Sequence, residues 1–301
     1  MADVDGLVTA ARHRDARAVA RIISLIEDAD PLLPEVMGAL TRGNVRNPYV
    51  VGITGSPGVG KSTTTSALIA HWRAQDATVA VLAVDPSSPF TGGALLGDRV
   101  RMQAHATDTG VFIRSMASRG HLGGLAAATP QAIRVLESSG FDVVLVETVG
   151  VGQAEVDIAA MADTTVVLLA PGMGDGVQAA KAGLLEVADI LAVNKADRDG
   201  ADDAVRELRH MVSTASERAP GDWRPPVVRS VAVAEGGAAE LVEAIEKHRA
   251  WLASSGAASQ RRLSRAAHEI RALATAMLTS RLGLQLDNPR LRLLAAQVVT
   301  G

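Results

Sequence analysis

Short apolar runs alternate with stretches of helical spacing along the middle of the chain. The runs are rich in β-branched residues and read, in chain order, YVVGIT, TVAVLAVD, VFIRS, FDVVLVE, TTVVLLAP, DILAVNK and VVRSVAV. Runs of this kind are typical of parallel strands that are buried on both faces. Because helical stretches separate them, the sequence predicts an α/β fold with a doubly wound, mostly parallel sheet.

Both ends of the chain have the periodicity of amphipathic helices. Near the N-terminus, the apolar residues with helical spacing are Val19, Ile22, Ile23 and Ile26, then Leu33, Val36, Met37 and Leu40. Near the C-terminus, a third stripe consists of Ala266, Ile270, Leu273, Ala274, Met277 and Leu278. The sequence therefore predicts helical extensions on both sides of the sheet.

Two breaks divide the chain into three predicted parts. Asn47 and Pro48 separate the N-terminal helices from the first apolar run, and LASSGAASQ, after Trp251, reads as a small polar linker. We predict an N-terminal helical extension over 1–47, a central domain over 48–251 and a C-terminal helical arm over 252–301. The apolar stripe of the arm packs either back on its own domain or on a second copy, as a dimer arm.

Composition narrows the possible functions. The 301 residues carry a net charge of -3, which argues against binding to the phosphate backbone of nucleic acids. Cysteine is absent, which excludes disulfides, thiolate zinc sites and thiol nucleophiles. The N-terminus lacks the apolar core of a secretory signal, and no apolar run approaches the ~18 residues of a membrane span. We expect a soluble cytoplasmic protein that binds neither nucleic acid nor membrane.

The segment GSPGVGKS matches the P-loop pattern G-x-x-x-x-G-K-[ST] at every position, between a predicted strand and a predicted helix. Its glycines let backbone N–H groups curl around phosphate oxygens. Lys61 is expected to reach the β- and γ-phosphates, and the Ser62 hydroxyl to bind Mg²⁺. The residues predicted to contact nucleotide here are Gly55, Ser56, Pro57, Gly58, Val59, Gly60, Lys61, Ser62 and Thr63.

The segment NKAD, at the end of a later strand, indicates which base is bound. The Asp197 carboxylate can accept hydrogen bonds from the N1–H and amine of guanine, whereas adenine offers neither donor there. Asn194 can bond the other edge of the base, and the stem of Lys195 can cover its face. After the next strand, a candidate loop that closes over the base consists of Ser230, Val231 and Ala232.

Three carboxylates are candidates for the magnesium site. Glu147 ends the buried run VVLVE and begins ETVG, in which Gly150 can offer its N–H to the γ-phosphate. Asp85 ends another strand, and Asp98 lies in the segment TGGALLGDRVRM. With Ser62, these carboxylates exceed what a partly hydrated Mg²⁺ usually binds directly, so some act through water or at another stage of turnover.

Five segments together resemble one known family. They are GSPGVGKST, VDPSSPFTGGALLGDRVRM, ETVGVGQAE, GMGDGVQAAKAG and NKAD, in this order. The chain is similar in these segments to the MeaB/ArgK family of GTPases, which accompany adenosylcobalamin-dependent acyl-CoA mutases, chiefly methylmalonyl-CoA mutase. The resemblance implies a P-loop GTPase core, an N-terminal helical extension and a C-terminal arm that forms a homodimer.

The resemblance also implies roles for individual residues. Asp85, Asp98 and Glu147 match the magnesium and switch motifs of the family, and with Lys61 they form the expected catalytic set. A third switch is expected over 171–181, where Lys181 takes part in communication with the mutase. The implied function is a GTP-dependent chaperone that gates loading and protection of the mutase cofactor.

Other functions fit the P-loop from the residues alone. A metal-insertion GTPase usually carries a His-rich or Cys-containing site, but the seven histidines here are scattered. A kinase would transfer the γ-phosphate to an acceptor other than water, and a scaffold would bind nucleotide without turnover. For hydrolysis of GTP to GDP and phosphate, no general base is evident, and Gln153 is a candidate for positioning water.

Overall fold

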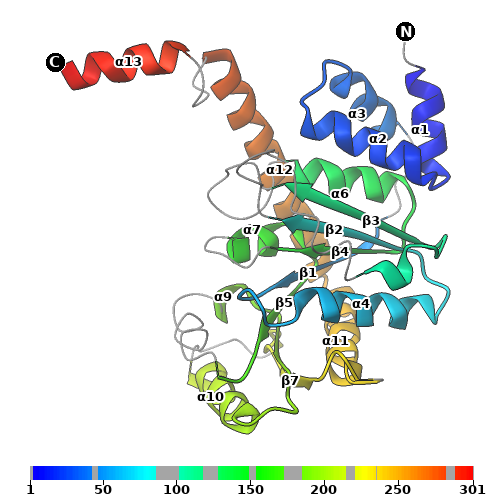
Figure 1. The fold of residues 1–301 in the computed structure, drawn as a ribbon, viewed down its shortest axis with the longest axis vertical. Coiled ribbons are helices and arrows are strands. Elements are labelled where there is room, and N and C mark those ends of the chain that lie inside the picture. The colour runs from blue at the N-terminus through cyan, green and yellow to red at the C-terminus, as the bar shows by residue number, and fades with distance from the viewer. Residues whose placement is uncertain are drawn as a thin grey trace.

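The computed structural model describes residues 3–42, 47–85, 102–117, 128–148, 154–172, 185–214, 221–234, 236–282 and 289–300. A seven-stranded sheet in the order β3-β2-β4-β1-β5-β6-β7 forms its centre (Figure 1). The strands are β1 (Tyr49–Thr54), β2 (Val79–Asp85), β3 (Val111–Ala117), β4 (Val143–Glu147), β5 (Thr164–Leu169), β6 (Ile190–Asn194) and β7 (Val227–Ser230). All neighbouring pairs are parallel, which confirms the predicted fold class.

Helices cover both faces of this sheet (Figure 1). One face carries α4 (Lys61–Arg73) and α11 (Ala239–Ser255). The other face carries α6 (Thr129–Ser138), α7 (Ala154–Met161) and α10 (Ala201–Thr214). Two short helices, η1 (Gln103–His105) and α9 (Leu185–Val187), lie in connections. Along β4, alternate residues enter the two cores: Val143 and Leu145 join one, Val144 and Val146 the other. Burial on both faces explains the continuous apolar runs.

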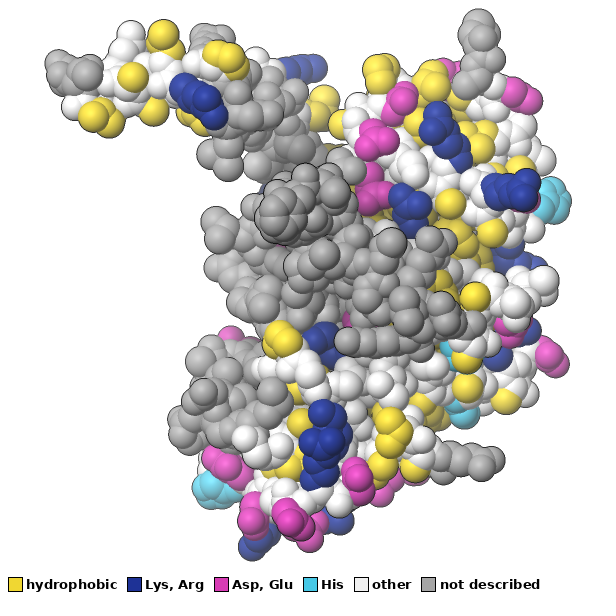
Figure 2. Space-filling model, viewed as in Figure 1, with side chains coloured by type: hydrophobic (Ala, Val, Ile, Leu, Met, Phe, Trp, Pro, Cys, Tyr) yellow, Lys and Arg dark blue, Asp and Glu magenta, His cyan; other side chains and the backbone are white. Residues whose placement is uncertain are grey.

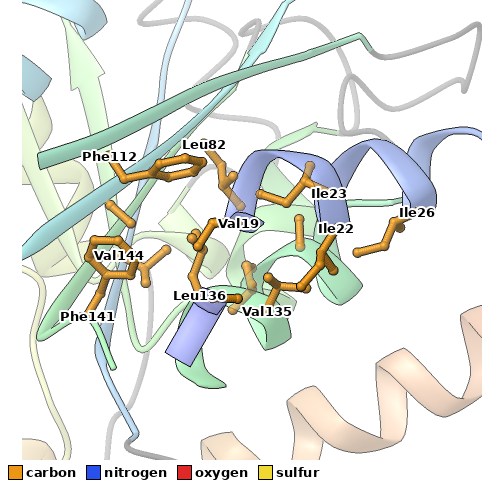
Figure 3. Close-up of a cluster of buried hydrophobic side chains, with 14 of the residues drawn as sticks. Val19, Ile22, Ile23, Ile26, Leu82, Phe112, Val135, Leu136, Phe141 and Val144 are labelled. Atoms are coloured by element: carbon orange, nitrogen blue, oxygen red, sulfur yellow. The ribbon is translucent and has the colours of Figure 1, made fainter. Parts of the chain in front are cut away.

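The N-terminal extension is a group of three helices, α1 (Val4–Arg12), α2 (Ala16–Glu27) and α3 (Leu33–Thr41). Asp15 caps α2 by accepting a hydrogen bond from the backbone N–H of Ala18 at 2.8 Å. The buried stripe of α2 packs on Val135 and Leu136 of α6, as Figure 3 shows. The predicted helical periodicity of this segment is therefore confirmed, and α6 connects the extension to the sheet.

The C-terminal segment differs from the sequence prediction. LASSGAASQ is not a linker: α11 continues through Ser255, and α12 (Ala257–Leu282) begins two residues later. Only Gly256 interrupts the helices, with a positive φ of 77° that suits glycine. The prediction was wrong because small polar residues were read as a loop, although alanine and serine are compatible with a helix. In Figure 1, α12 projects from the body and α13 (Pro289–Thr300) follows it.

Ion pairs attach the start of α12 to the amino ends of the strands. Arg261 donates to both carboxylate oxygens of Asp189, which precedes β6, at 2.7 and 2.5 Å. Arg265 donates to Glu137 near the end of α6 at 2.7 Å and lies 3.9 Å from Asp163, which precedes β5. These contacts place the first turns of α12 against the amino ends of β5 and β6.

A buried histidine lies beside this attachment. His248 of α11 is fully buried, its Nδ1 lies 2.7 Å from the Thr164 hydroxyl, and its Nε2 lies 3.4 Å from Asp189. Burial, opposed by the Asp189 carboxylate and assisted by the Arg261 charge, lowers the pKa of the His248 imidazole to about 4. Trp251 stacks on the ring with 5.6 Å between centroids, so an aromatic side chain covers one face of the imidazole.

The projecting helices leave large apolar side chains exposed. On α12 these are Leu263, Ile270, Leu273, Met277 and Leu278, and on α13 they are Leu293, Leu294, Val298 and Val299. Figure 2 shows hydrophobic side chains spread over the outer helix. The predicted stripe is thus helical, but its outer part does not pack back on its own domain. Within the described ranges, no helix is both long and apolar enough to cross a membrane.

Candidate functional site

The loop from β1 to α4 lies at the carboxyl edge of the sheet. Gly55, Gly58 and Gly60 have positive φ values of 141°, 82° and 99°. A Cβ on Gly55 would collide with the backbone carbonyl of Leu168 in β5, so only glycine fits there. Gly60 is the N-cap of α4, which directs the first N–H groups of that helix into the loop. The sequence thus builds an anion-binding turn at a helix N-terminus.

Lys61 lies over this turn. Its Nζ donates to the carbonyl oxygens of Gly55 and Ser56 at 2.8 and 3.2 Å, and the residue is only 8% exposed. Pro57 and Gly58 are exposed, whereas Val59 is buried. The predicted segment from Gly55 to Thr63 therefore forms one continuous loop and helix start, with the lysine ammonium held inside it.

Glu147 meets the start of α4 from the neighbouring strand. In the sheet register it lies opposite both Ile53 of β1 and Ala83 of β2. Its Oε1 accepts a hydrogen bond from the Ser62 hydroxyl at 2.8 Å, and its Oε2 accepts one from Thr65, also at 2.8 Å. The carboxylate is 2% exposed, so these donors compensate its burial. The structure thus brings together two predicted residues, Ser62 and Glu147.

The donor set at this point fits a magnesium ion. Mg²⁺ prefers hard oxygen ligands and is commonly bound by one or two carboxylates, with the P-loop hydroxyl in such sites. Ser62 and Glu147 supply those two oxygen types within hydrogen-bonding distance of each other. Among the described residues, no group of three His, Asp or Glu side chains could hold a metal.

Several predicted side chains lie outside the described part of the structure. Asp85 ends β2, two positions beyond the residue paired with Glu147, so its backbone is at the same edge. Its side chain is not described. Asp98, Gly150, Gln153 and Lys181 also lie outside the described residues, as does most of the expected third switch.

The predicted base-reading segment contacts the P-loop directly. Asn194, at the end of β6, is 2% exposed and donates from Nδ2 to the Val59 carbonyl at 2.8 Å. Lys195, with a φ of 56°, donates from Nζ to the Gly58 carbonyl at 2.7 Å. Asp197 follows in an exposed turn. Two motifs that are far apart in the sequence are therefore joined side by side.

The candidate closing loop lies next to Asn194. Ser230 pairs with Asn194 in the sheet register, and the Ala232 N–H donates to Asn194 Oδ1 at 3.2 Å. Val231 donates its backbone N–H to the Gly237 carbonyl at 2.8 Å, which closes the loop. Ser230 is buried, and within the described part of the chain its hydroxyl has no hydrogen-bond partner. All three predicted loop residues are thus within the immediate surroundings of Asn194.

Sequence reasoning missed two contacts in this site. One is the hydrogen bond from Thr65 to Glu147. The other joins the buried hydroxyls of Thr54 and Thr148 at 2.8 Å, between the end of β1 and the residue after Glu147. Thr65 follows Ser62 by three positions, so the two share a helix face, which is a signal that the sequence contains.

A comparison with protein families gives a match over most of the chain. The model described as "Methylmalonyl Co-A mutase-associated GTPase MeaB" matches residues 19–286. This range includes the P-loop, Glu147 and the NKAD segment as well as the whole of the projecting helix α12.

Relatives and solved structures agree with that match. A Pyrococcus abyssi protein named as a GTPase is 48% identical over 92% of this chain and 86% of its own length. The GTPase ArgK of Escherichia coli is 38% identical over 83% of this chain and 77% of its own length. The crystal structure of a LAO/AO transport system kinase superposes with a TM-score of 0.76 at 28% identity, covering 100% of this chain and 94% of the other.

Proposed function

This chain belongs to the MeaB family of methylmalonyl-CoA mutase-associated GTPases, and from that premise we propose that it is a GTP-dependent chaperone of an adenosylcobalamin-dependent acyl-CoA mutase. The resemblance inferred from the motifs is confirmed, and the activity is hydrolysis of GTP to GDP and phosphate. The mutase partner, the magnesium ion, the homodimer and a cytoplasmic location are parts of the proposal.

The main support for the proposed magnesium site is the hydrogen bond between Ser62 and Glu147. It holds a hydroxyl and a carboxylate oxygen 2.8 Å apart beside the P-loop. We assign Ser62 and Glu147 as protein ligands, with Asp85 and Asp98 as further candidates. When bound, the ion supplies neutralisation of the charge on the phosphate oxygens.

The chain's own groups then account for most of the phosphate chemistry. The loop amides and the N-terminus of α4 would hold the β-phosphate, and the Lys61 ammonium would contact the β- and γ-phosphates. Lys61 is already positioned over the loop by the Gly55 and Ser56 carbonyls. A preorganised positive charge stabilises the transferring phosphoryl group without needing to reorganise during the reaction.

Guanine recognition follows from the NKAD segment. Asp197 would accept hydrogen bonds from guanine, while Asn194 holds the segment against the P-loop through Val59. Lys195 would cover one face of the base with its stem, since its Nζ is bound to Gly58. The loop of Ser230, Val231 and Ala232 would close the site from the next strand. This arrangement supports a base site adjacent to the phosphate site.

The chaperone role requires that nucleotide state changes affinity for the mutase. A ligand that binds two conformational states equally does not change the equilibrium between them. The GTP-bound and GDP-bound forms must therefore differ in their affinity for the mutase. The test measures dissociation constants for a purified acyl-CoA mutase with a nonhydrolysable GTP analogue and with GDP. We expect at least a fivefold difference, the lower limit of typical coupling. Equal constants would end the gating proposal.

The projecting helices support the homodimer. Large exposed apolar patches are rare on monomeric soluble proteins, and they usually mark an association surface. The exposed residues of α12 and α13 follow helical spacing, which suits packing against a second helix. We therefore assign the arm as the dimer contact, which is tested below by substitution.

A further inference from the structure

Two hydroxyls from one face of α4 hold the Glu147 carboxylate. Ser62 donates to Oε1 and Thr65 donates to Oε2, each at 2.8 Å. Ser62 is 4% exposed, Thr65 is 0% exposed and Glu147 is 2% exposed. Each carboxylate oxygen thus has its own donor, one helical turn apart, in a site where lost hydrogen bonds are not replaced by water.

The Thr65 hydroxyl has one proton and two acceptors within reach. These are the Lys61 carbonyl at 3.0 Å and Glu147 Oε2 at 2.8 Å. In a regular helix the carbonyl also receives a backbone N–H, and a carboxylate is the stronger acceptor. The Thr65 hydroxyl therefore donates its proton to Glu147 rather than to the Lys61 carbonyl of its own helix.

We propose that Thr65 is a positioning residue that orients the Glu147 carboxylate for magnesium. This inference rests on the proposed function, since it assumes that Glu147 and Ser62 face Mg²⁺. Ser62 is itself an assigned ligand, so its hydroxyl serves both the ion and Glu147. Thr65 is not a ligand and serves the carboxylate alone. By fixing Oε2, it leaves Oε1 on the Ser62 side, toward the P-loop.

The neighbouring residue Thr64 provides a matched control. It is also 0% exposed in α4, but its hydroxyl has no hydrogen-bond partner in the described ranges. Replacing either threonine by valine removes one hydroxyl and preserves shape. The two variants therefore differ in whether the lost group contacted Glu147.

The experiment measures the dissociation constant of a fluorescent GDP analogue with Mg²⁺ and with EDTA in the full-length chain. The ratio of the two constants reports the contribution of the ion independently of turnover. We expect Thr65→Val to reduce that ratio about tenfold, the usual effect of removing a hydrogen bond to a charged group. Thr65→Ser should restore the wild-type ratio, and Thr64→Val should retain it.

Three results would overturn the inference. They are an unchanged ratio in Thr65→Val with unchanged affinities, an unchanged ratio in that variant because affinity falls equally with Mg²⁺ and with EDTA, and the same reduced ratio in Thr64→Val. Thermal unfolding of every variant identifies a folding defect; if Thr65→Val has one, Thr65→Ala, which also lacks the hydroxyl, is compared with Thr65→Ser, which keeps it. If wild type itself shows no Mg²⁺ dependence, the proposed magnesium site fails, which is a different result from failure of the Thr65 inference alone.

Discussion

Asn194 at the end of β6 donates a hydrogen bond to the backbone carbonyl of Val59 in the P-loop, with 2.8 Å between the two atoms. The same side chain accepts the Ala232 N–H at 3.2 Å. A single buried amide thus joins the P-loop, the end of β6 and the loop after β7. The Asn194 side chain also lies close to Gly60, where a Cβ would collide with Asn194 Nδ2.

Asn194→Ala should weaken both folding and nucleotide binding. The substitution leaves the Val59 carbonyl and the Ala232 N–H without this partner in a buried site, which costs about 1–3 kcal/mol for an unsatisfied group. Urea unfolding should report that loss, and titration with fluorescent GDP should show a higher dissociation constant. Asn47→Ala, at an exposed position on the opposite edge of the sheet, is the control and should change neither quantity. Wild-type values for Asn194→Ala would refute the bridging role.

Asp197→Asn should convert the base preference from guanine to xanthine. The amide reverses the hydrogen-bonding sense at one edge of the base, which suits the carbonyl that xanthine has in place of the guanine amine. Competition between GTP and XTP for the fluorescent nucleotide measures this switch. Asp199→Asn, an exposed aspartate in the same turn, should keep the GTP preference. If Asp197→Asn also keeps it, the assignment of the base-reading carboxylate is wrong.

The buried His248 should make the protein less stable as pH falls below neutrality. Its folded-state pKa of about 4 lies below the ~6.5 of an unfolded histidine, so the unfolded chain alone takes up a proton in between. The contribution of His248 to the free energy of unfolding is fully present above pH 6.5. It falls by roughly 3 kcal/mol as the pH falls toward 4. Urea unfolding of wild type and His248→Gln across this window measures the difference.

The control for that measurement is the exposed His210 of α10. Carboxylates titrate in the same window in every variant, so the informative quantity is the difference between each variant and wild type. His210→Gln should run parallel to wild type, whereas His248→Gln should show a shallower loss of stability with acidification. Parallel curves for both variants would mean that the imidazole is protonated normally in the native state.

Met277→Glu should dissociate the proposed homodimer. Met277 is 55% exposed on α12, and a buried charge at a helix contact is strongly unfavourable. Light scattering during size-exclusion chromatography should show a monomer with its GTP hydrolysis unchanged at the P-loop. Thr275→Glu adds the same charge about 200° around the helix and should remain dimeric. If the wild-type protein is monomeric at micromolar concentration, the assignment of the arm as a dimer contact is wrong.

The strands were predictable from sequence for a specific physical reason. A parallel strand with helices on both faces is apolar along its whole length, so β1 and β4 stand out as VVGI and VVLV without any alignment. The P-loop and NKAD were likewise recognisable, because their geometry requires particular residue types at fixed spacing. Which side chains meet across the site was less accessible, since it depends on strand order and register.

Contacts between distant segments mark the limit of that reasoning. Nothing local in the sequence links Arg261 to Asp189, and the pair forms only because α12 crosses the amino ends of β5 and β6. The linker error has a related cause. Ala257 and Ala258 pack against the core beneath α11, and this tertiary support makes a helix of residues whose composition alone indicates a loop.

The anchoring of α12 by Arg261 and Arg265 has a consequence for how such a protein can diversify. Arg261 and Arg265 bind groups at the amino ends of β5 and β6, whereas the P-loop and the NKAD segment lie at the carboxyl ends of the strands, so the base of the arm and the phosphate loop are at opposite edges of the sheet. Under the proposed dimer assignment, we expect an exchange of the outer arm to change the oligomeric state and to leave GTP hydrolysis intact, so that the arm and the P-loop domain could evolve separately.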